Sequence, residues 1–192
     1  FFTDVACCWI KECDIDGWRL DVGDEISHFF WKNFRKAIKA VKKDMLIIGE
    51  IWHYAGDFLE GDEWDTVMNY PFYLNLIDLL ADEKINVSQF VQNLGYLKGR
   101  LNKKCYPLMW NLIDSHDTAR FLHLCNDNKK KQHLAAAFQL LLPGMPMVYY
   151  GDEYAMPGAN DPDCRRGMYW DEEYQDKEMY NWYKKLMQIR KA

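Results

Sequence analysis

The sequence of 192 residues predicts an α/β fold in which short parallel strands alternate with helices. Two observations support this prediction. Five short apolar segments recur along the chain, at residues 17–22, 45–49, 66–70, 109–113 and 146–150, and helical stretches separate them. A short apolar run between two helices is typical of a strand that is buried in a parallel sheet.

The clearest predicted helix covers residues 27–43. Trp31, Phe34, Ile38 and Val41 fall on one face at helical spacing, and lysines and an arginine surround the other face. Acidic residues precede this helix and lysines end it, the order that suits the helix dipole. Further helices are expected at 4–14, 72–80, 87–102, 132–142 and 174–191.

Alternating strands and helices allow two architectures, a doubly wound open sheet or a (β/α)8 barrel of which only part is present. An intact barrel needs about 250 residues and eight strands. No linker, low-complexity tract or fixed repeat divides the chain, so we expect a single domain. As a barrel, it would be a fragment that lacks the first three strands.

Composition excludes several classes of partner. The net charge is −5, and the basic residues stand singly among acids, so no basic face is available to bind nucleic acid. The longest apolar runs are far shorter than the roughly 20 residues of a membrane span, so we expect no membrane partner. The first residue is Phe1, and we expect that the native N-terminus is missing.

Six cysteines occur without any Cys-x-x-Cys pair, in a chain too large to need disulfides for stability. This usage favours reduced thiols and a cytoplasmic location over secretion. A disulfide-bonded, exported protein remains the alternative, and Asn86 begins a short glycosylation acceptor pattern that would then have meaning.

Three predicted strands end in acidic residues, and these acids are the candidate catalytic residues. Asp21 closes the first strand, Glu50 closes the second, and Asp117 follows the fourth. One strand-end acid can be a helix cap, but three indicate a shared catalytic mouth. Because side chains alternate along a strand, Arg19 and Asp21 share a face, where the arginine would keep the carboxylate ionised.

Less specific interpretations stay open for single residues. A strand-end acid can cap a helix, His116 can be a buried, hydrogen-bonded histidine, and Trp52 with His53 can be loop packing. Other chemistries fit worse. The sequence has no phosphate-binding glycine loop, no complete calcium loop, no metal spacing among its five histidines and no nucleophile elbow.

The motifs at 16–22 (DGWRLDV), 48–53 (IGEIWH) and 113–117 (IDSHD) resemble three signature segments of the α-amylase family, in the family's order and spacing. Residues 67–72, 147–153 and 160–166 are similar to its sixth strand, its eighth strand and the loop that follows. Within the family, the chain looks most like the neopullulanase, cyclomaltodextrinase and maltogenic amylase branch.

This resemblance implies a partial TIM (β/α)8 barrel that contains strands four to eight. It also implies a retaining glycoside hydrolase that cleaves α-glucosidic bonds in cyclodextrins, pullulan and maltooligosaccharides. Asp21 would attack the anomeric carbon, and Glu50 would protonate the leaving oxygen and then activate water. Asp117 would stabilise the distorted sugar. An α-glucosidase or glucanotransferase of the same family is the alternative activity.

Further site residues follow from the resemblance. Arg19 and His116 would contact the sugar, Asp161 and Arg165 would hold a neighbouring glucose ring, and Trp52 and His53 would shape the cleft. Glu25 matches a residue of the branch, whereas Asp24 stands where the branch often has Asn. This departure leaves the preference between α-1,4 and α-1,6 bonds, and between hydrolysis and transfer, open.

The family's third-strand signature, the N-terminal strands and the C-terminal β-domain have no counterpart here. No cofactor or metal is therefore expected in this chain, although calcium could bind the full-length protein. A partial barrel exposes sheet edges, so self-association is expected. An inactive structural fragment of the enzyme, and a catalytically silent binding or transporter-associated subunit, remain alternatives.

Overall fold

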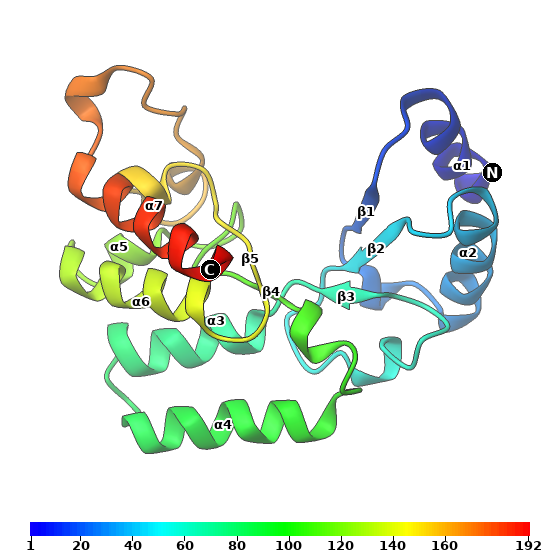
Figure 1. The fold of residues 1–192 in the computed structure, drawn as a ribbon, viewed down its shortest axis with the longest axis horizontal. Coiled ribbons are helices and arrows are strands. Elements are labelled where there is room, and N and C mark those ends of the chain that lie inside the picture. The colour runs from blue at the N-terminus through cyan, green and yellow to red at the C-terminus, as the bar shows by residue number, and fades with distance from the viewer. The chain divides into compact units, whose positions relative to one another are not determined.

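The computed structural model describes residues 1–192, which form two compact units. The first unit contains Phe1–Asn69 and Lys98–Met109, and the second contains Tyr70–Leu97 and Trp110–Ala192 (Figure 1). The strands form one parallel sheet of three strands and one of two, and they do not close into a barrel. The predicted α/β class with parallel strands is confirmed.

The first unit is built on a parallel sheet in the order β1 (Gly17–Leu20), β2 (Leu46–Gly49) and β3 (Thr66–Val67). Two helices pack with it, α1 (Phe2–Cys13) and α2 (His28–Val41). The register places Leu20 opposite Gly49, so the residues that follow them leave the sheet at the same edge.

Helix α2 forms where the sequence predicts it, one or two residues shorter at each end. Ser27 caps its N-terminus, because the serine hydroxyl accepts a hydrogen bond from the backbone N–H of Phe30. The predicted apolar face buries Trp31, Phe34 and Ile38. Burial of three large side chains is what stabilises a helix of this length in a protein.

The second unit contains two short parallel strands and most of the helices. Its elements are β4 (Trp110–Asn111), β5 (Met145–Pro146), α3 (Tyr70–Leu76), a π-helical turn (Ile77–Ala81), α4 (Val87–Arg100, ending in the first unit), α5 (Phe121–Leu124), α6 (Lys129–Leu141) and α7 (Lys177–Lys191). None of the chain's helices is both long and apolar enough to cross a lipid bilayer.

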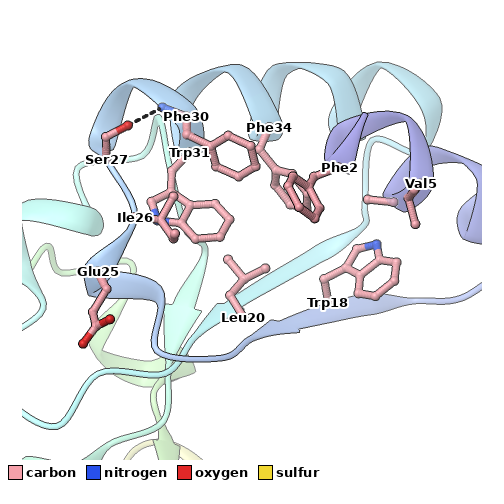
Figure 2. Close-up of a pocket in the computed structure, with 11 residues that line it drawn as sticks. Phe2, Val5, Trp18, Leu20, Glu25, Ile26, Ser27, Phe30, Trp31 and Phe34 are labelled. Carbon is pink, nitrogen blue, oxygen red and sulfur yellow. Dashed lines mark hydrogen bonds between the residues drawn. The ribbon is translucent and has the colours of Figure 1, made fainter.

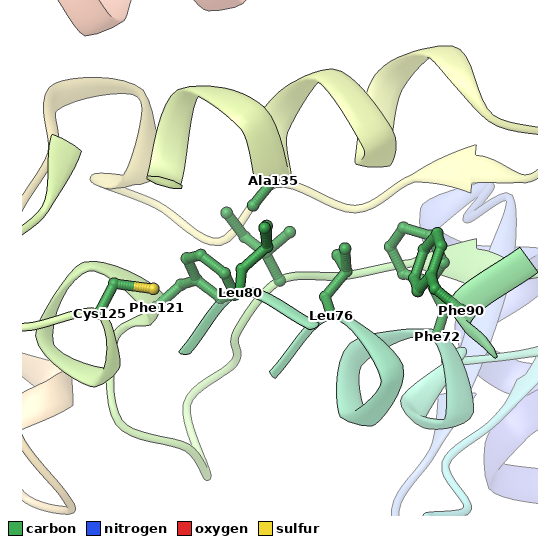
Figure 3. Packing of buried hydrophobic residues seen from close by; sticks show 8 residues of the cluster. Phe72, Leu76, Leu80, Phe90, Phe121, Cys125 and Ala135 are labelled. Carbon is green, nitrogen blue, oxygen red and sulfur yellow. The ribbon is translucent and has the colours of Figure 1, made fainter. Parts of the chain in front are cut away.

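One apolar cluster joins most of these helices to the segment that follows β4 (Figure 3). Its buried members are Phe72, Leu76, Leu80, Phe90, Ile113, Phe121, Cys125 and Ala135. A second cluster lies between α6 and α7, where Leu140 packs with Met179 and Tyr183. Ile113 in the first cluster anchors the segment 112–120, which follows β4 and carries predicted site residues.

The strands are shorter than predicted, and the reasons are local. The third strand ends at Val67 because Tyr70 begins α3. Pro71 lies in the first turn of α3, where its missing backbone N–H costs no helical hydrogen bond. The fifth is Met145–Pro146, so the prediction of a strand over 146–150 is wrong for residues 147–150. The short helix α5 was not predicted, since four residues show no periodicity.

Candidate active site

In the first unit, Arg19 contacts two of the predicted catalytic acids at once. Its Nη1 lies 2.5 Å from Asp21 Oδ1, and its Nη2 lies 2.5 Å from Glu50 Oε1. The Glu50 side chain is 3% exposed, whereas that of Asp21 is 75% exposed. One guanidinium thus stands between a buried and an open carboxylate.

The parallel sheet explains this meeting. Asp21 follows β1 and Glu50 follows β2, and the backbone N–H of Glu50 donates to the carbonyl of Leu20 over 2.9 Å. Arg19 and Asp21 are two residues apart and share a face of their strand, while Leu20 between them is buried on the other side. The strand-end position of the acids therefore brings their side chains together.

The turn after Asp21 has an uncommon backbone conformation. Val22 has φ 42° and ψ 48°, in the left-handed region that β-branched residues rarely adopt. In this conformation its backbone N–H donates to Glu50 Oε2 over 3.1 Å. Residues held in such conformations cluster at functional sites, and here the result is a fixed Glu50 carboxylate.

Two tryptophans support that turn. The Trp31 indole donates to the carbonyl of Gly23 over 2.7 Å, and the buried Trp64 ring packs over Gly23 and Gly49. A Cβ on Gly49 would lie 2.2 Å from the Trp64 ring, so only glycine permits this packing directly before Glu50.

Neither Asp21 nor Glu50 caps a helix. The 3₁₀ turn Gly23–Glu25 that follows β1 has no side-chain cap, and Ser27 supplies the cap of α2. The less specific interpretation of these two acids as N-caps therefore fails, and their side chains are engaged with Arg19 and Val22 instead.

The remaining predicted residues of the first unit lie around this centre in different ways. His53 is exposed, and its Nε2 lies 3.9 Å from Asp24 Oδ2. Trp52 is 42% exposed. Glu25 lies in the wall of a pocket of about 670 Å³ formed by α1, β1 and α2, with its carboxylate directed away from the aromatic rings (Figure 2). Asp24, rather than Glu25, is the acid beside His53.

The second unit brings together the other four predicted residues. His116 Nε2 lies 3.2 Å from Asp117 Oδ2, and Arg165 Nη2 lies 3.2 Å from Asp117 Oδ1. Arg165 Nε also lies 2.7 Å from Asp161 Oδ1 and donates to the carbonyl of His116 over 2.9 Å. Segments 48 residues apart in the sequence thus form one charged cluster.

A buried charged cluster in the same unit was not predicted from the sequence. Arg120 and Asp152 are each 1% exposed and form an ion pair of 3.0 Å. Burial raises the pKa of Asp114, and burial together with Asp114 raises the pKa of Asp152 well above its ordinary value. Asp114 and Asp152 stand in two of the segments that resemble the family and Arg120 stands in none, and no spacing marks the three residues as partners.

No three His, Cys, Asp or Glu side chains in the structure gather closely enough to hold a metal ion. All six cysteines are free thiols, and Cys105, Cys125 and Cys164 are buried.

Residues 2–175 match the family described as "Alpha amylase, catalytic domain". The chain belongs to the α-amylase family. It is 49% identical over 191 residues to a cyclomaltodextrinase from Thermoanaerobacter pseudethanolicus, covering 100% of this chain and 33% of the relative. It is 43% identical over 191 residues to an intracellular maltogenic amylase from Bacillus subtilis, covering 100% of this chain and 32% of the relative.

A solved structure agrees with the sequence relatives. The cyclic α-maltosyl-(1→6)-maltose hydrolase from Arthrobacter globiformis, in complex with that cyclic sugar, superposes with a TM-score of 0.95 at 36% identity, over 97% of this chain and 42% of that one. The resemblance to the cyclomaltodextrinase and maltogenic amylase branch is confirmed. This member of the α-amylase family spans about a third of the length of its curated relatives.

Proposed function

We propose that this chain carries the catalytic acids of a retaining glycoside hydrolase that cleaves α-glucosidic bonds in α-glucans. The observation that carries the proposal is the single guanidinium of Arg19 held between Asp21 and Glu50. The carboxyl groups of retaining enzymes stand about 5–5.5 Å apart, too close for a water molecule to attack between them. Two acids that share one guanidinium suit that spacing.

In the proposed mechanism, Asp21 attacks the anomeric carbon, and a glycosyl ester forms as the bond to the leaving oxygen breaks. Glu50 gives its proton to that oxygen, which becomes a free hydroxyl. Glu50 then takes a proton from water, the water oxygen attacks the same carbon, and Asp21 leaves as a carboxylate. Two inversions at one carbon retain the α configuration.

The protein environment suits these roles. Arg19 stabilises the ionised form of Asp21 that attacks, and the Val22 N–H orients Glu50. Asp117 is the third carboxylate, which stabilises the distorted sugar, and His116 contacts the same ring. Arg165 and Asp161, whose side chains lie 2.7 Å apart, hold the neighbouring glucose unit by charge-assisted hydrogen bonds.

Cyclodextrins, pullulan and maltooligosaccharides are the proposed substrates. The names of the cyclomaltodextrinase and of the hydrolase that binds a cyclic maltosyl-maltose support this choice. Trp52 and His53 line the cleft in this proposal, and Glu25 contributes to bond preference. The exposed ring of Trp52 is the type of surface against which a sugar face packs.

We further propose that the five strands are strands four to eight of a (β/α)8 barrel, because residues 2–175 match the catalytic domain of that family. A cytoplasmic location is supported by the six free thiols and by the intracellular maltogenic amylase relative.

Trapping the covalent intermediate tests the proposal. Maltosyl fluoride carries a leaving group that departs without protonation, so Glu50→Gln should slow only the second step and let the glycosyl ester accumulate. Mass spectrometry after trypsin digestion should then find one maltosyl group on the peptide 20–32, which contains Asp21.

Two variants in the Glu50→Gln background serve as controls. Asp21→Asn should abolish the label. Asp16→Asn, at the opposite end of β1 with a 98% exposed side chain, should leave the label unchanged. A label on another peptide, or the same label after Asp21→Asn, would contradict the assignment of the nucleophile.

A further inference from the structure

Arg120 is buried inside the second unit and is held on one side by the core. Its Nη1 donates to Asp152 Oδ1 over 3.0 Å and to the carbonyl of Tyr150 over 2.6 Å. The guanidinium carbon lies 4.1 Å from the ring centre of Tyr149 and 4.8 Å from that of Tyr150. These contacts fix the plane of the guanidinium.

On its other side, Arg120 holds the segment 158–164. Its Nε donates to the carbonyl of Cys164 over 3.2 Å, and its backbone N–H donates to the carbonyl of Gly158 over 2.9 Å. One residue therefore binds both ends of the segment. A Cβ on Gly158 would lie 2.9 Å from the Asp163 carbonyl oxygen and 3.0 Å from Arg120 Cγ, so the segment closes tightly around the arginine.

The residue after this segment is Arg165, which reaches the proposed sugar site. Arg165 Nε donates to the carbonyl of His116 over 2.9 Å, and Arg165 Nη2 donates to Asp117 Oδ1 over 3.2 Å. The Cys164 thiol also donates to the His116 carbonyl over 3.4 Å. The contacts thus run from the buried Asp152 through Arg120 and Cys164 to Arg165.

We infer that Arg120 is a positioning residue, which holds Arg165 against His116 and Asp117 by tying the segment 158–164 to the buried carboxylate of Asp152. This inference rests on the proposed function of Asp117 and Arg165 in sugar binding. A guanidinium can donate to Asp152 and to the Cys164 carbonyl in two directions at once. The compact ammonium of a lysine keeps the charge beside Asp152 but cannot also reach Cys164.

The variant Arg120→Lys therefore removes the hydrogen bond to the Cys164 carbonyl but keeps the buried positive charge beside Asp152. The readout is the side-chain Nε–H resonance of Arg165 in nitrogen-15 spectra of the 192-residue chain, assigned by its disappearance in Arg165→Lys. In Arg120→Lys we expect this proton to exchange with water at least tenfold faster. Backbone amides of residues 158–166 should also exchange at least tenfold faster, while those of α7 keep their rates.

Arg190→Lys is the matched control. Arg190 also donates to two backbone carbonyls of the second unit, those of Leu140 and Gly144, both far in the sequence from residues 158–166. Its replacement should leave the Arg165 resonance unchanged. Gly158→Ala is the second test variant, because the added Cβ should push the segment off an intact Arg120 and give the same faster exchange.

An unchanged Arg165 Nε–H and unchanged amide exchange in folded Arg120→Lys or Gly158→Ala would overturn the inference. Equal acceleration throughout the second unit would also overturn it, because Arg120 would then only stabilise the fold. These readouts need no sugar. A wild-type chain that shows the protected Arg165 proton but does not bind maltotriose in a titration would contradict the proposed function. It would not contradict the inference that Arg120 positions Arg165.

Discussion

The backbone N–H of Val22 donates to the carboxylate of Glu50 over 3.1 Å, although 28 residues separate the two in the sequence. Val22 makes this bond from the left-handed region, at φ 42°. The turn after the proposed nucleophile therefore orients the proposed acid, and the chain accepts a backbone conformation that is unfavourable for valine to do so.

Replacing Val22 by glycine should relieve this strain. The left-handed conformation costs a β-branched residue about 1–3 kcal/mol, whereas glycine pays about 0.5–1 kcal/mol in added chain entropy. The Val22 side chain is 45% exposed, so little burial is lost. We expect Val22→Gly to leave the free energy of unfolding unchanged or to raise it by about 1 kcal/mol in urea titrations.

Val91→Gly is the matched control, because Val91 is a solvent-exposed residue of α4 with an ordinary helical conformation. This change should lower the free energy of unfolding by a few tenths of a kcal/mol. A loss for Val22→Gly as large as that of Val91→Gly, or larger, would show that the Val22 conformation is not strained.

The two buried acids near Arg120 should respond oppositely to amide replacement. Asp114 Oδ2 accepts the backbone N–H of Phe121 over 2.8 Å, and an asparagine oxygen can do the same. Asp114→Asn should therefore preserve or raise stability. Asp152→Asn removes the carboxylate that pairs with the buried Arg120, and we expect a loss of about 3 kcal/mol.

Asp114 and Asp152 also make the stability of the chain depend on pH. Both pKa values are raised in the folded chain, Asp114 by burial and Asp152 by burial and by Asp114, so folding takes up protons and stability falls as pH rises above about 4. Asp114→Asn should reduce that fall above about pH 4 in urea titrations. An equally steep fall in the variant would show that Asp114 does not contribute to this pH dependence.

Asp65 should contribute an opposite pH dependence in the first unit. Burial alone would raise its pKa, but Lys39, Arg35 and the backbone N–H of Ile47 outweigh burial and hold the pKa below its ordinary value. Its contribution to stability is present above about pH 4 and is lost as pH falls through the lowered pKa.

Asp65→Asn should therefore cost about 1–3 kcal/mol at pH 7 and flatten the loss of stability below about pH 4. Urea titrations followed by tryptophan fluorescence at several pH values measure both effects. Asp44→Asn, at an exposed position of the turn before β2, should change neither. Equal acid sensitivity in Asp65→Asn and the wild type would show that other carboxylates control acid unfolding.

Self-association follows from the open sheet. Within the three-stranded sheet, β1 and β3 each pair with β2 alone and leave an edge without a strand partner. Unpaired strand edges favour pairing with another chain. We expect the sedimentation coefficient to rise with protein concentration in the micromolar range, whereas a constant value for a monomer across that range would contradict the expectation.

The sequence predicts most of the architecture because apolar periodicity is a local signal. Helix α2 and strand β2 lie within one or two residues of their predicted bounds, since each has a buried face that the sequence spells out. Strand lengths are less predictable. Tyr70 enters a helix, and residues 147–150 stay irregular, because pairing depends on neighbours that the local sequence does not contain.

The site was partly predictable for the same reason. Strand-end acids meet wherever parallel strands are in register, so Asp21 and Glu50 could be expected to lie together. The strained turn at Val22 and the hold of Arg120 on residues 158–164 could not be predicted. Both depend on hydrogen bonds between segments at least 28 residues apart, which leave no period or spacing in the sequence.

The anomeric form of the first product tests the central claim most directly. Proton NMR should follow hydrolysis of β-cyclodextrin and pullulan by this chain during the first minutes, before mutarotation, with Glu50→Gln and Asp16→Asn as paired variants. The retaining mechanism of Asp21 and Glu50 predicts release of the α-anomer by the wild type and by Asp16→Asn, and none by Glu50→Gln. The β-anomer as first product would contradict it.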